Sequence, residues 1–489
     1  MDEAAHYEIA TSDVPILLFL SLRRTPTVDF RTSRCQHGRT GPDVTHITVL
    51  SLAFLFAQPE VPSVTSPAIN PAADNRRRLA NEEALGMILN AYPVLVDVAA
   101  AVEVVPEMTP TTILTSGAPL DWADYTGGQR RAILYSAVYE GLARTIEEAA
   151  TLLDRGDIRV RSTQEFNCVG SVAGIYTASM PVFVVRDENS GSTAFCNLYE
   201  GKSRHRLNYG SFNQEVVDGL RWLETTMAPI LRSCLRESGP IALRSMMAKA
   251  LRMGDELHSR NTAATLLFER ELTAHLFKVA TNKSSRSQVQ EVLRFFAEND
   301  YAFLRLSMAA AKATADAAHG VEFSSLITGQ VISCRDYSIR VSGLGNTWFR
   351  GEHPKLEGKF FEGFTANDAE WIGGESCYTE LVGLGAMAQL CAPSLMNYQG
   401  GSFEAMAAHT ESMYAISLDE HDHFRIPSLD FRGTPVGVDL FSVIATSTTP
   451  LINGGLAGRG GGQIGAGILR PQMGAFTEAM KEYTATYLS

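Results

Sequence analysis

The chain has 489 residues and a formal net charge of −12, with 45% hydrophobic and 20% charged residues. This length and composition are typical of a globular protein with several domains, so disorder is excluded as its overall state. The acidic balance and the lack of a lysine or arginine stripe argue against nucleic-acid binding, which needs a basic surface.

Seven cysteines are scattered along the chain without a Cys-x-x-Cys pair or a paired Cys/His spacing. Neither a zinc site nor a disulfide framework is predicted, and no metal ion or cofactor is expected. The apolar runs at residues 14–22 and 47–57 have about half of the roughly 20 residues that a membrane helix needs. No membrane span and no export signal is predicted, and reduced thiols fit a cytoplasmic protein.

Residues 1–75 are predicted to be a poorly structured or atypical N-terminal extension, because their short apolar runs have no sustained period and prolines interrupt them. An amphipathic helix then leads into a short buried strand at residues 94–98. A second strand is predicted at 112–115 and a helix at 129–153. This alternation predicts a Rossmann-like α/β layer over residues 76–157, which is incomplete if the extension lacks its first unit.

The following segments differ in character. Residues 158–212 are predicted to be an α+β part with a hairpin, because two strand-like runs flank Asn-Ser-Gly at 189–191. Residues 213–319 have apolar side chains at steps of three and four, which predicts an inserted all-helical domain. Residues 320–489 return to strand-like pieces between glycine-rich turns, which predicts a C-terminal α+β domain. The predicted fold class is therefore α/β and α+β, in several domains.

Two glycine-rich polar segments, residues 427–439 and 453–467, bracket a short apolar run near the end of the chain. Each glycine costs backbone entropy and permits a positive φ or a close backbone approach, so this density predicts loops that hold a ligand. Asp430, Arg432 and Asp439 lie among these glycines, and a guanidinium beside exposed backbone N–H groups binds carboxylate or phosphate well. The alternative is a pair of tight turns in which Arg432 is an internal strut.

A polar segment at residues 253–261 interrupts the helical part of the chain. Asp255 and His258 are three residues apart and share a face if the segment is helical, and Glu256 and Arg260 are four apart. A general base can be assembled from such residues. The alternative is a solvated helix start with Glu256 and Arg260 as a surface pair.

Other polar positions are weaker candidates. Arg340 lies on a predicted strand before the Gly-Leu-Gly turn of residues 343–345, which resembles half of a phosphate-binding loop, and a simple tight turn is the alternative. Glu200 directly follows a strand, and strand ends present side chains to clefts. Cys168 has no adjacent base in the sequence and is interpreted as a buried hydrophobe. Glu375 would oppose an anion at the glycine-rich helix start that contains it, unless it binds a donor.

Several of these segments recur in a particular order. They are Asn167 to Gly170, Ser-Met-Pro at 179–181, Glu-Gly at 200–201, Met-Gly-Asp-Glu-Leu-His-Ser-Arg-Asn at 253–261, Arg-Val-Ser-Gly-Leu-Gly at 340–345, Leu-Asp-Phe-Arg-Gly-Thr-Pro at 429–435 and Gly-Gln-Ile-Gly-Ala-Gly at 462–467. In this order they resemble the YahG/YlbE-like family, which includes AllG-type subunits of oxamate carbamoyltransferase. The resemblance covers about residues 80–480. The chain differs from the family pattern at its start, because residues 1–75 are not predicted to form the strand–helix–strand unit that family members have there.

The resemblance implies carbamoyl transfer between oxamate or oxalurate and phosphate, with carbamoyl phosphate as the other carbamoyl carrier. It also implies an FdrA-type partner subunit similar to succinyl-CoA synthetase, and a homo-oligomer is a further alternative. It carries Asp255 and Glu256 over as site positions, and they are the catalytic candidates because a carboxylate there could move a proton. Together with Glu200, the substrate-binding candidates are Asn261, Arg340, Gly343, Gly345, Asp430, Arg432, Gly433, Asp439, Asn453 and Gln463. Two functions stay open: an enzyme subunit that handles a small carbamoyl or amide anion, and a non-catalytic binding or scaffold subunit.

Overall fold

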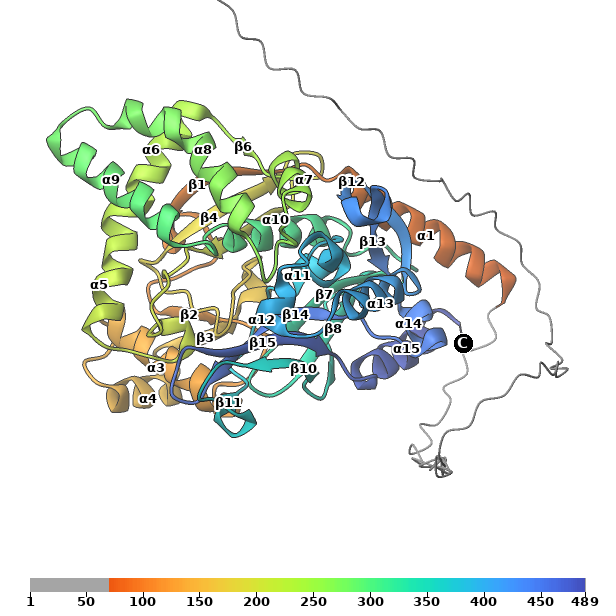
Figure 1. Ribbon diagram of the computed structural model, residues 1–489. Coiled ribbons are helices and arrows are strands. Elements are labelled where there is room, and N and C mark those ends of the chain that lie inside the picture. The colour runs from red at the N-terminus through yellow and green to blue at the C-terminus, as the bar shows by residue number, and fades with distance from the viewer. Residues whose placement is uncertain (1–69, 489) are drawn as a thin grey trace, which may run out of the picture. The chain divides into compact units, whose positions relative to one another are not determined.

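Helices and short strands alternate through residues 70–488, which are the residues that this computed structural model describes (Figure 1). In chain order, the helices are α1 (Pro71–Asn90), α2 (Ala101–Val104), α3 (Gly127–Tyr139), α4 (Ile146–Arg155), α5 (Gln214–Trp222), α6 (Ala228–Ser238), α7 (Arg244–Arg252), α8 (Thr262–Val279), α9 (Lys283–Glu298), α10 (Leu304–Ala317), α11 (Tyr378–Leu381), α12 (Leu395–Gln399), α13 (Phe403–Tyr414), α14 (Leu440–Thr446) and α15 (Gly474–Tyr487). Within these residues, no helix has both the length and the apolar composition needed to cross a membrane.

The strands are mostly short and fall into several small sheets. They are β1 (Pro93–Ala100), β2 (Thr112–Thr115), β3 (Arg159–Ser162), β4 (Pro181–Asp187), β5 (Thr193–Asn197), β6 (Ile241–Ala242), β7 (Ile327–Ile332), β8 (Tyr337–Val341), β9 (Phe349–Gly351), β10 (Lys355–Phe360), β11 (Ala369–Glu370), β12 (Ser417–Ile426), β13 (Arg432–Val438), β14 (Ile452–Gly458) and β15 (Gln463–Arg470). The mixture of helix and sheet predicted from the sequence is confirmed.

Helix α1 includes residues 71–75, which were expected to belong to the N-terminal extension. Asn70 caps the helix, because its side-chain oxygen accepts a hydrogen bond from the backbone N–H of Ala72 at 2.9 Å, and Pro71 occupies the first turn. Residues 1–69, the rest of the predicted extension, lie outside the described residues.

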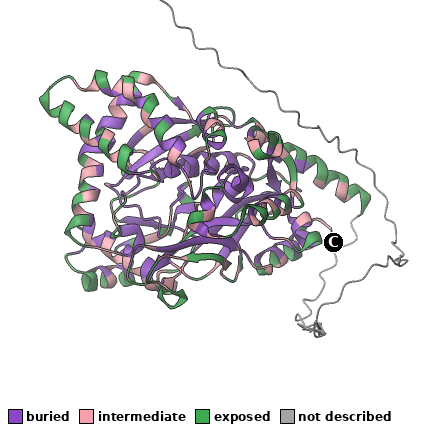
Figure 2. Ribbon diagram, viewed as in Figure 1, coloured by how far each residue is buried: buried purple, intermediate pink, exposed green. Residues whose placement is uncertain are grey.

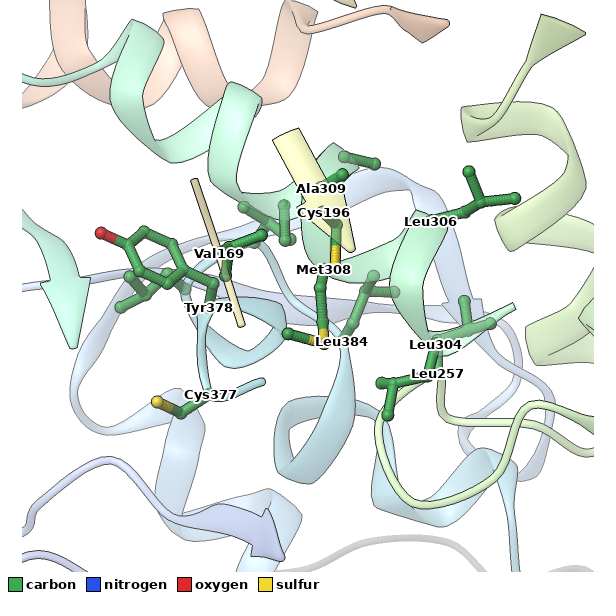
Figure 3. Close-up of a cluster of buried hydrophobic side chains, with 14 of the residues drawn as sticks. Val169, Cys196, Leu257, Leu304, Leu306, Met308, Ala309, Cys377, Tyr378 and Leu384 are labelled. Atoms are coloured by element: carbon green, nitrogen blue, oxygen red, sulfur yellow. The ribbon is translucent and has the colours of Figure 1, made fainter. Parts of the chain in front are cut away.

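Helix α10 is the centre of the fold. Residues 304–315 are all buried, and the helix contacts β1, β4, β5, β7 and α11. In Figure 2 it is purple along its length, whereas α5 and α9 have exposed green faces. Figure 3 shows Met308 and Ala309 of α10 among Cys196 of β5 and Leu384. A helix that is buried on nearly every side is typical of a protein interior, and the alanines of α10 let neighbouring elements approach closely.

The sheet that contains β1 has the strand order β5-β4-β1-β6. β1 pairs antiparallel with both β4 and β6, whereas β2 and β3 form a separate parallel pair. The Rossmann-like layer predicted from strand–helix–strand alternation is therefore not confirmed. The reason is that alternation along the chain does not determine which strands pair, since the partners of β1 come from distant segments.

This sheet also draws its strands from three of the predicted domains. β1 lies in residues 76–157, the β4–β5 hairpin in 158–212, and β6 in 213–319. The hairpin turns at the predicted Asn-Ser-Gly, where Gly191 has a φ of 79°. The described residues form part of one compact unit, so the division into domains stays a prediction.

Residues 213–319 contain α5 to α10, interrupted by β6. The apolar spacing predicts that one face of each helix is buried. In α8 this face is formed by Phe268, Leu272 and Leu276, which recur at steps of four and are buried. The ring of Phe268 meets that of Phe296 in α9 edge to face, with centroids 5.6 Å apart. Residues 253–261 are not helical and form the connection between α7 and α8.

Both glycine-rich segments belong to β-hairpins: residues 427–439 form the turn and second strand of β12–β13, and residues 453–467 lie in β14–β15. In the second hairpin, Gly467 pairs with Gly454 on one side and with Gly358 of β10 on the other. A Cβ atom at Gly467 would lie 2.5 Å from the backbone oxygen of Glu357, so the backbones approach more closely there than a side chain permits. Close strand packing explains this glycine, in line with the tight-turn alternative rather than with an open loop.

Candidate functional site

A pocket of about 1060 Å³ is formed by segments far apart in the sequence. Its wall comes from the turn at residues 199–209, the segment around His258, the start of α10 and strands β14 and β15. Its charged lining residues are Lys202, Arg204, Arg206, Arg305, Arg459, Glu200 and Glu370. Five cations face two carboxylates there, although the chain as a whole has a net charge of −12. The pocket therefore favours a negatively charged ligand.

The polar segment 253–261 is buried at the edge of this pocket. Asp255 and Glu256 have no exposed surface, and His258 is 5% exposed. The backbone makes this possible with positive φ angles of 105° at Gly254 and 71° at Leu257. The solvated helix start considered as an alternative is wrong, because burial of the carboxylates requires partners that a solvated turn does not need.

Asp255 connects the loop of residues 253–261 to helix α8 through a hydrogen bond. Its Oδ2 atom accepts a hydrogen bond from the backbone N–H of Ala264 at 2.8 Å, in the first turn of that helix. Its Oδ1 atom has no hydrogen-bond partner among the described residues and lies 3.6 Å from Nε of Arg260. Burial raises the pKa of Asp255 to about 6. Arg260 thus lies beside Asp255 and not beside Glu256.

The raised pKa of Asp255 predicts a pH-dependent stability. The folded protein holds this proton more tightly than the unfolded chain, where an aspartate titrates near 4, so stability falls as the pH rises from about 4 to about 6. We expect Asp255→Asn to remove about 2–3 kcal/mol of that fall. Urea unfolding across this pH range measures how the free energy of unfolding changes with pH. Asp422→Asn, at a side chain that is 75% exposed, should keep the wild-type slope, and an Asp255→Asn curve parallel to wild type would contradict the assignment.

The Glu256 carboxylate holds the loop together. It accepts hydrogen bonds from the backbone N–H groups of His258 and Ser259 and from Nδ2 of Asn453, the last at 3.0 Å. Burial raises its pKa to about 7. Asn261 supports the same turn by donating from Nδ2 to the backbone oxygen of His258 at 3.0 Å. Glu256 and Asn261 therefore lie behind the pocket wall, where they position His258.

His258 and Glu380 form a buried pair at the pocket. Nδ1 of His258 lies 2.8 Å from Oε1 of Glu380, which has no exposed surface. Glu380 also accepts from the backbone N–H groups of Ala386 at 3.1 Å and Asn453 at 3.0 Å, and from the hydroxyl of Thr379 at 2.9 Å. Because this carboxylate only accepts, it assigns the proton to Nδ1 of a neutral His258. Nε2, which has no hydrogen bond among the described residues, is then left as a proton acceptor.

The charge state of His258 follows from two opposing effects. Burial lowers the pKa of His258, but the Glu380 and Glu256 carboxylates together raise it by more, so the pKa lies above its usual range. A carboxylate–histidine pair with a free Nε2 at a pocket is the usual arrangement for moving a proton to or from a ligand. The sequence suggested His258 only as a neighbour of Asp255, because its partner is 122 residues away.

None of the four arginines that line the pocket was predicted, and Arg206 and Arg305 have hydrogen-bond partners that fix them on the wall. Arg206 donates to the hydroxyl of Tyr199 at 3.2 Å, and its guanidinium lies 4.4 Å from the ring centre of Tyr209. Arg305 donates to Oδ1 of Asn197 at 2.9 Å. The signal that marks Arg206 in the sequence is the basic stretch at residues 202–206, directly after Glu200. Arg305 has no comparable signal.

Three of the predicted binding residues line the pocket: Glu200, Asn453 and Gln463. Glu200 closes the turn below it by accepting from the backbone N–H groups of Leu207 at 2.6 Å and Asn208 at 3.1 Å. Nε2 of Gln463 donates to the hydroxyl of Tyr398, another lining residue. The structure therefore brings together residues that are more than 250 positions apart in the sequence.

The other predicted binding residues do not belong to the pocket lining. Arg340 is buried, and its Nη2 atom lies 2.6 Å from Oδ1 of Asp316. The turn after it, with Gly343 and Gly345, packs against the C-terminal helix, where the Tyr487 hydroxyl donates to the backbone oxygen of Gly343. A phosphate at this turn stays a prediction.

The β12–β13 hairpin places Asp430 and Arg432 at a surface, whereas Gly433 is buried against the backbone of His421. The guanidinium of Arg432 lies over the ring of Tyr414, 3.6 Å from its centre, and Nε lies 2.7 Å from Oε1 of Glu420. Asp439 caps α14 by accepting from the backbone N–H of Ser442 at 2.9 Å. A ligand held by Arg432 would be separate from the pocket, and that role stays a prediction.

The environments of Cys168 and Glu375 match the interpretations given for these residues from the sequence. Cys168 is buried, and burial raises the pKa of its thiol well above the usual range, which is unfavourable for a nucleophile. Glu375 binds donors, as considered above: it accepts from the backbone N–H groups of Gly117 at 2.8 Å and Gly170 at 2.6 Å, and from Gln164 Nε2 at 2.8 Å.

The fold and the pocket define a mixed helix-and-sheet protein with a pocket lined by more cationic than anionic side chains. Residues 158–376 match the family model described as oxamate carbamoyltransferase subunit AllG. The chain is 36% identical to the uncharacterized protein YahG of Escherichia coli K12 over 429 residues, covering 87% of this chain and 90% of YahG. It is 35% identical to oxamate carbamoyltransferase subunit AllG of the same organism over 407 residues, covering 82% of this chain and 96% of AllG.

A solved structure is also similar. A conserved protein of unknown function from Enterococcus faecalis V583 superimposes with a TM-score of 0.82 at 35% identity, covering 86% of this chain and all of that one. The chain therefore belongs to the YahG/AllG-like family, as the ordered motifs predicted.

Proposed function

We propose that this chain is a subunit of a carbamoyltransferase-like enzyme, and that the pocket binds a small anionic amide or ureido compound such as oxamate or oxalurate. The observation that carries the proposal is the His258–Glu380 pair facing a pocket with an excess of cationic side chains. The name of the AllG relative, an oxamate carbamoyltransferase subunit, supports the substrate class.

The chemistry of carbamoyl transfer matches these groups. With oxalurate, a phosphate oxygen adds to the ureido carbonyl carbon, and the bond from that carbon to the oxamate nitrogen breaks. The leaving nitrogen must gain a proton, which protonated His258 donates from Nε2. In the opposite direction, neutral His258 takes the proton from the oxamate nitrogen as it attacks carbamoyl phosphate, and phosphate leaves. The raised pKa of His258 suits both roles near neutral pH.

The remaining residues have supporting roles in this proposal. Arginines on the wall neutralise the anionic substrates, and Asn453 and Gln463 contact them. Glu256 and Asn261 position the His258 loop. Asp255 anchors the same loop to α8. A pocket of about 1060 Å³ has room for a small organic anion together with phosphate.

We also propose an FdrA-type partner subunit similar to succinyl-CoA synthetase and a cytoplasmic location, both of which rest on the family resemblance. The alternative function is a non-catalytic binding or scaffold subunit of the same complex. In this alternative the pocket binds the same ligand, but His258 transfers no proton.

Calorimetry and thermal unfolding with oxamate, oxalurate, phosphate and carbamoyl phosphate test the ligand class. A ligand that binds the folded state at 100 times its Kd stabilises the protein by about 2.7 kcal/mol. We expect oxamate or oxalurate to give such a shift and oxamide, the neutral analogue, to give none. If none of the four anions binds, alone or with phosphate present, the proposed function is wrong.

A further inference from the structure

Arg305 is a buried cation without a counter-ion. The residue is 4% exposed, and its guanidinium donates to a neutral acceptor, Oδ1 of Asn197, at 2.9 Å. Its Nε atom has no hydrogen-bond partner among the described residues. No carboxylate of the described residues lies within 4 Å of its guanidinium, unlike the other buried cations of the fold. Arg305 nevertheless lines the pocket.

Arg340 shows what a structural arginine looks like in the same protein. It is 6% exposed, a similar burial, but its Nη2 atom lies 2.6 Å from Oδ1 of Asp316. Asp316 also pairs with the buried Lys312. In that cluster the charges compensate one another within the chain. Around Arg305 no such compensation exists in the described residues.

Two of the groups next to Arg305, Cys196 and Tyr199, are neutral near neutral pH. Burial raises the pKa of the Cys196 thiol to about 12, so this neighbour of Arg305 carries no charge near neutral pH. Tyr199, whose ring centre lies 6.0 Å from the guanidinium, is a phenol with a raised pKa. Removing a charge from water without an ion partner costs several kcal/mol. A negatively charged ligand in the pocket would supply the missing counter-ion.

The position of Arg305 relative to His258 favours a particular ligand. Arg305 lies in the first turn of α10, and Ser307 of the same helix donates from its hydroxyl to the backbone oxygen of Leu257 at 3.0 Å. Figure 3 shows Leu304 and Leu257 at this junction. The helix start and the His258 loop are thereby fixed to each other, so one ligand can meet both residues.

We propose that Arg305 is the specificity-determining residue of the pocket and binds the carboxylate of a small organic anion. The planar guanidinium matches a carboxylate with two parallel hydrogen bonds, from Nε and from an Nη atom that Asn197 does not use. The amide or ureido end of the same ligand then faces Nε2 of His258. This inference deepens the proposed function and rests on it for the identity of the ligand.

Calorimetry with oxalate, which has carboxylates but no amide, tests the subsite separately from the function. We expect wild type to bind oxalate and not oxamide, and Arg305→Met to bind oxalate at least about 30-fold more weakly, which corresponds to a loss of 2 kcal/mol at 1.4 kcal/mol per tenfold. Arg305→Lys keeps the charge without the planar fork and should bind about tenfold more weakly. Oxalate binding that is unchanged in Arg305→Met, or absent in wild type, overturns the proposal.

Thermal unfolding of the ligand-free variants provides the structural control. Arg305→Met removes an uncompensated charge and is expected to melt at or above the wild-type temperature, whereas Arg340→Met leaves Asp316 without one of its cations and should melt lower. Equal losses of melting temperature in both variants would make Arg305 a structural residue and overturn the proposal. If oxalate binding depends on Arg305 but neither oxamate nor oxalurate binds wild type, the carboxylate subsite stands and the proposed function fails.

Discussion

Replacement of His258 by glutamine is expected to reduce phosphate-dependent release of oxamate from oxalurate by about 10²–10⁴-fold, the usual contribution of a positioned general acid or base. Substrate binding should change little, because the substrate charge is neutralised by arginines and not by His258. Activity is measured with the partner subunits present, and binding of oxalurate to the isolated chain by calorimetry. The loss should therefore appear in kcat and not in the Kd for oxalurate.

A matched control is His319→Gln. His319 lies outside the pocket lining, and its Nδ1 atom lies 2.9 Å from the Thr328 hydroxyl. This variant should keep wild-type activity. Full activity of His258→Gln would show that the proton is moved elsewhere and would favour the non-catalytic alternative for this subunit.

Replacement of Asp316 by asparagine is expected to destabilise the protein by about 3–5 kcal/mol, because it leaves two buried cations without their common counter-ion. The side chains of Lys312 and Arg340 are only 1% and 7% exposed, and both pair with Asp316. Burial raises the pKa of Asp316, but the two cations lower it by more, so its folded-state pKa lies below the usual range. The stability that it contributes is present at neutral pH and is lost as the pH falls toward that pKa.

Urea unfolding at pH 7 measures the effect of Asp316→Asn. The control is Glu82→Gln, which removes one partner of a surface pair with Arg78 whose side chains are 59% and 57% exposed. That variant should change the free energy of unfolding by no more than about 1 kcal/mol. If Asp316→Asn lowered the free energy of unfolding no more than Glu82→Gln does, then water or a rearrangement of side chains would be compensating the charges of Lys312 and Arg340.

Local patterns in the sequence predicted local structure well. The β-type runs at residues 94–98 and 112–115 correspond to β1 and β2, and Asn-Ser-Gly at 189–191 is the turn of the β4–β5 hairpin. The predicted helix over 129–153 is two helices, α3 and α4, with a break between them. Periodicity reports which face of an element is buried, so it identifies elements without their partners.

The family was also determined by the sequence. Ordered motifs spread over the chain predicted the YahG/YlbE-like family with its AllG-type members, and the relatives confirm this. The motif at residues 253–261 contains His258, Glu256 and Asn261, so the sequence marked this part of the site. It did not assign their roles, because whether Glu256 faces a ligand or the backbone depends on how the loop turns.

Only the tertiary structure decided which charges are paired. Glu380 meets His258 from 122 residues away, and Asn197 meets Arg305 from 108 residues away. Arg305 has no sequence signal, because what distinguishes it is that no carboxylate of the described residues pairs with it, and chain spacing does not reveal this. The glycines of β14 and β15 suggested a loop because glycine serves open loops and close strand contacts equally well. The spacing of residues along the chain determines which side chains lie together only when they are a few positions apart. Burial and ion pairing depend on contacts between distant segments, and these contacts form only when the chain folds.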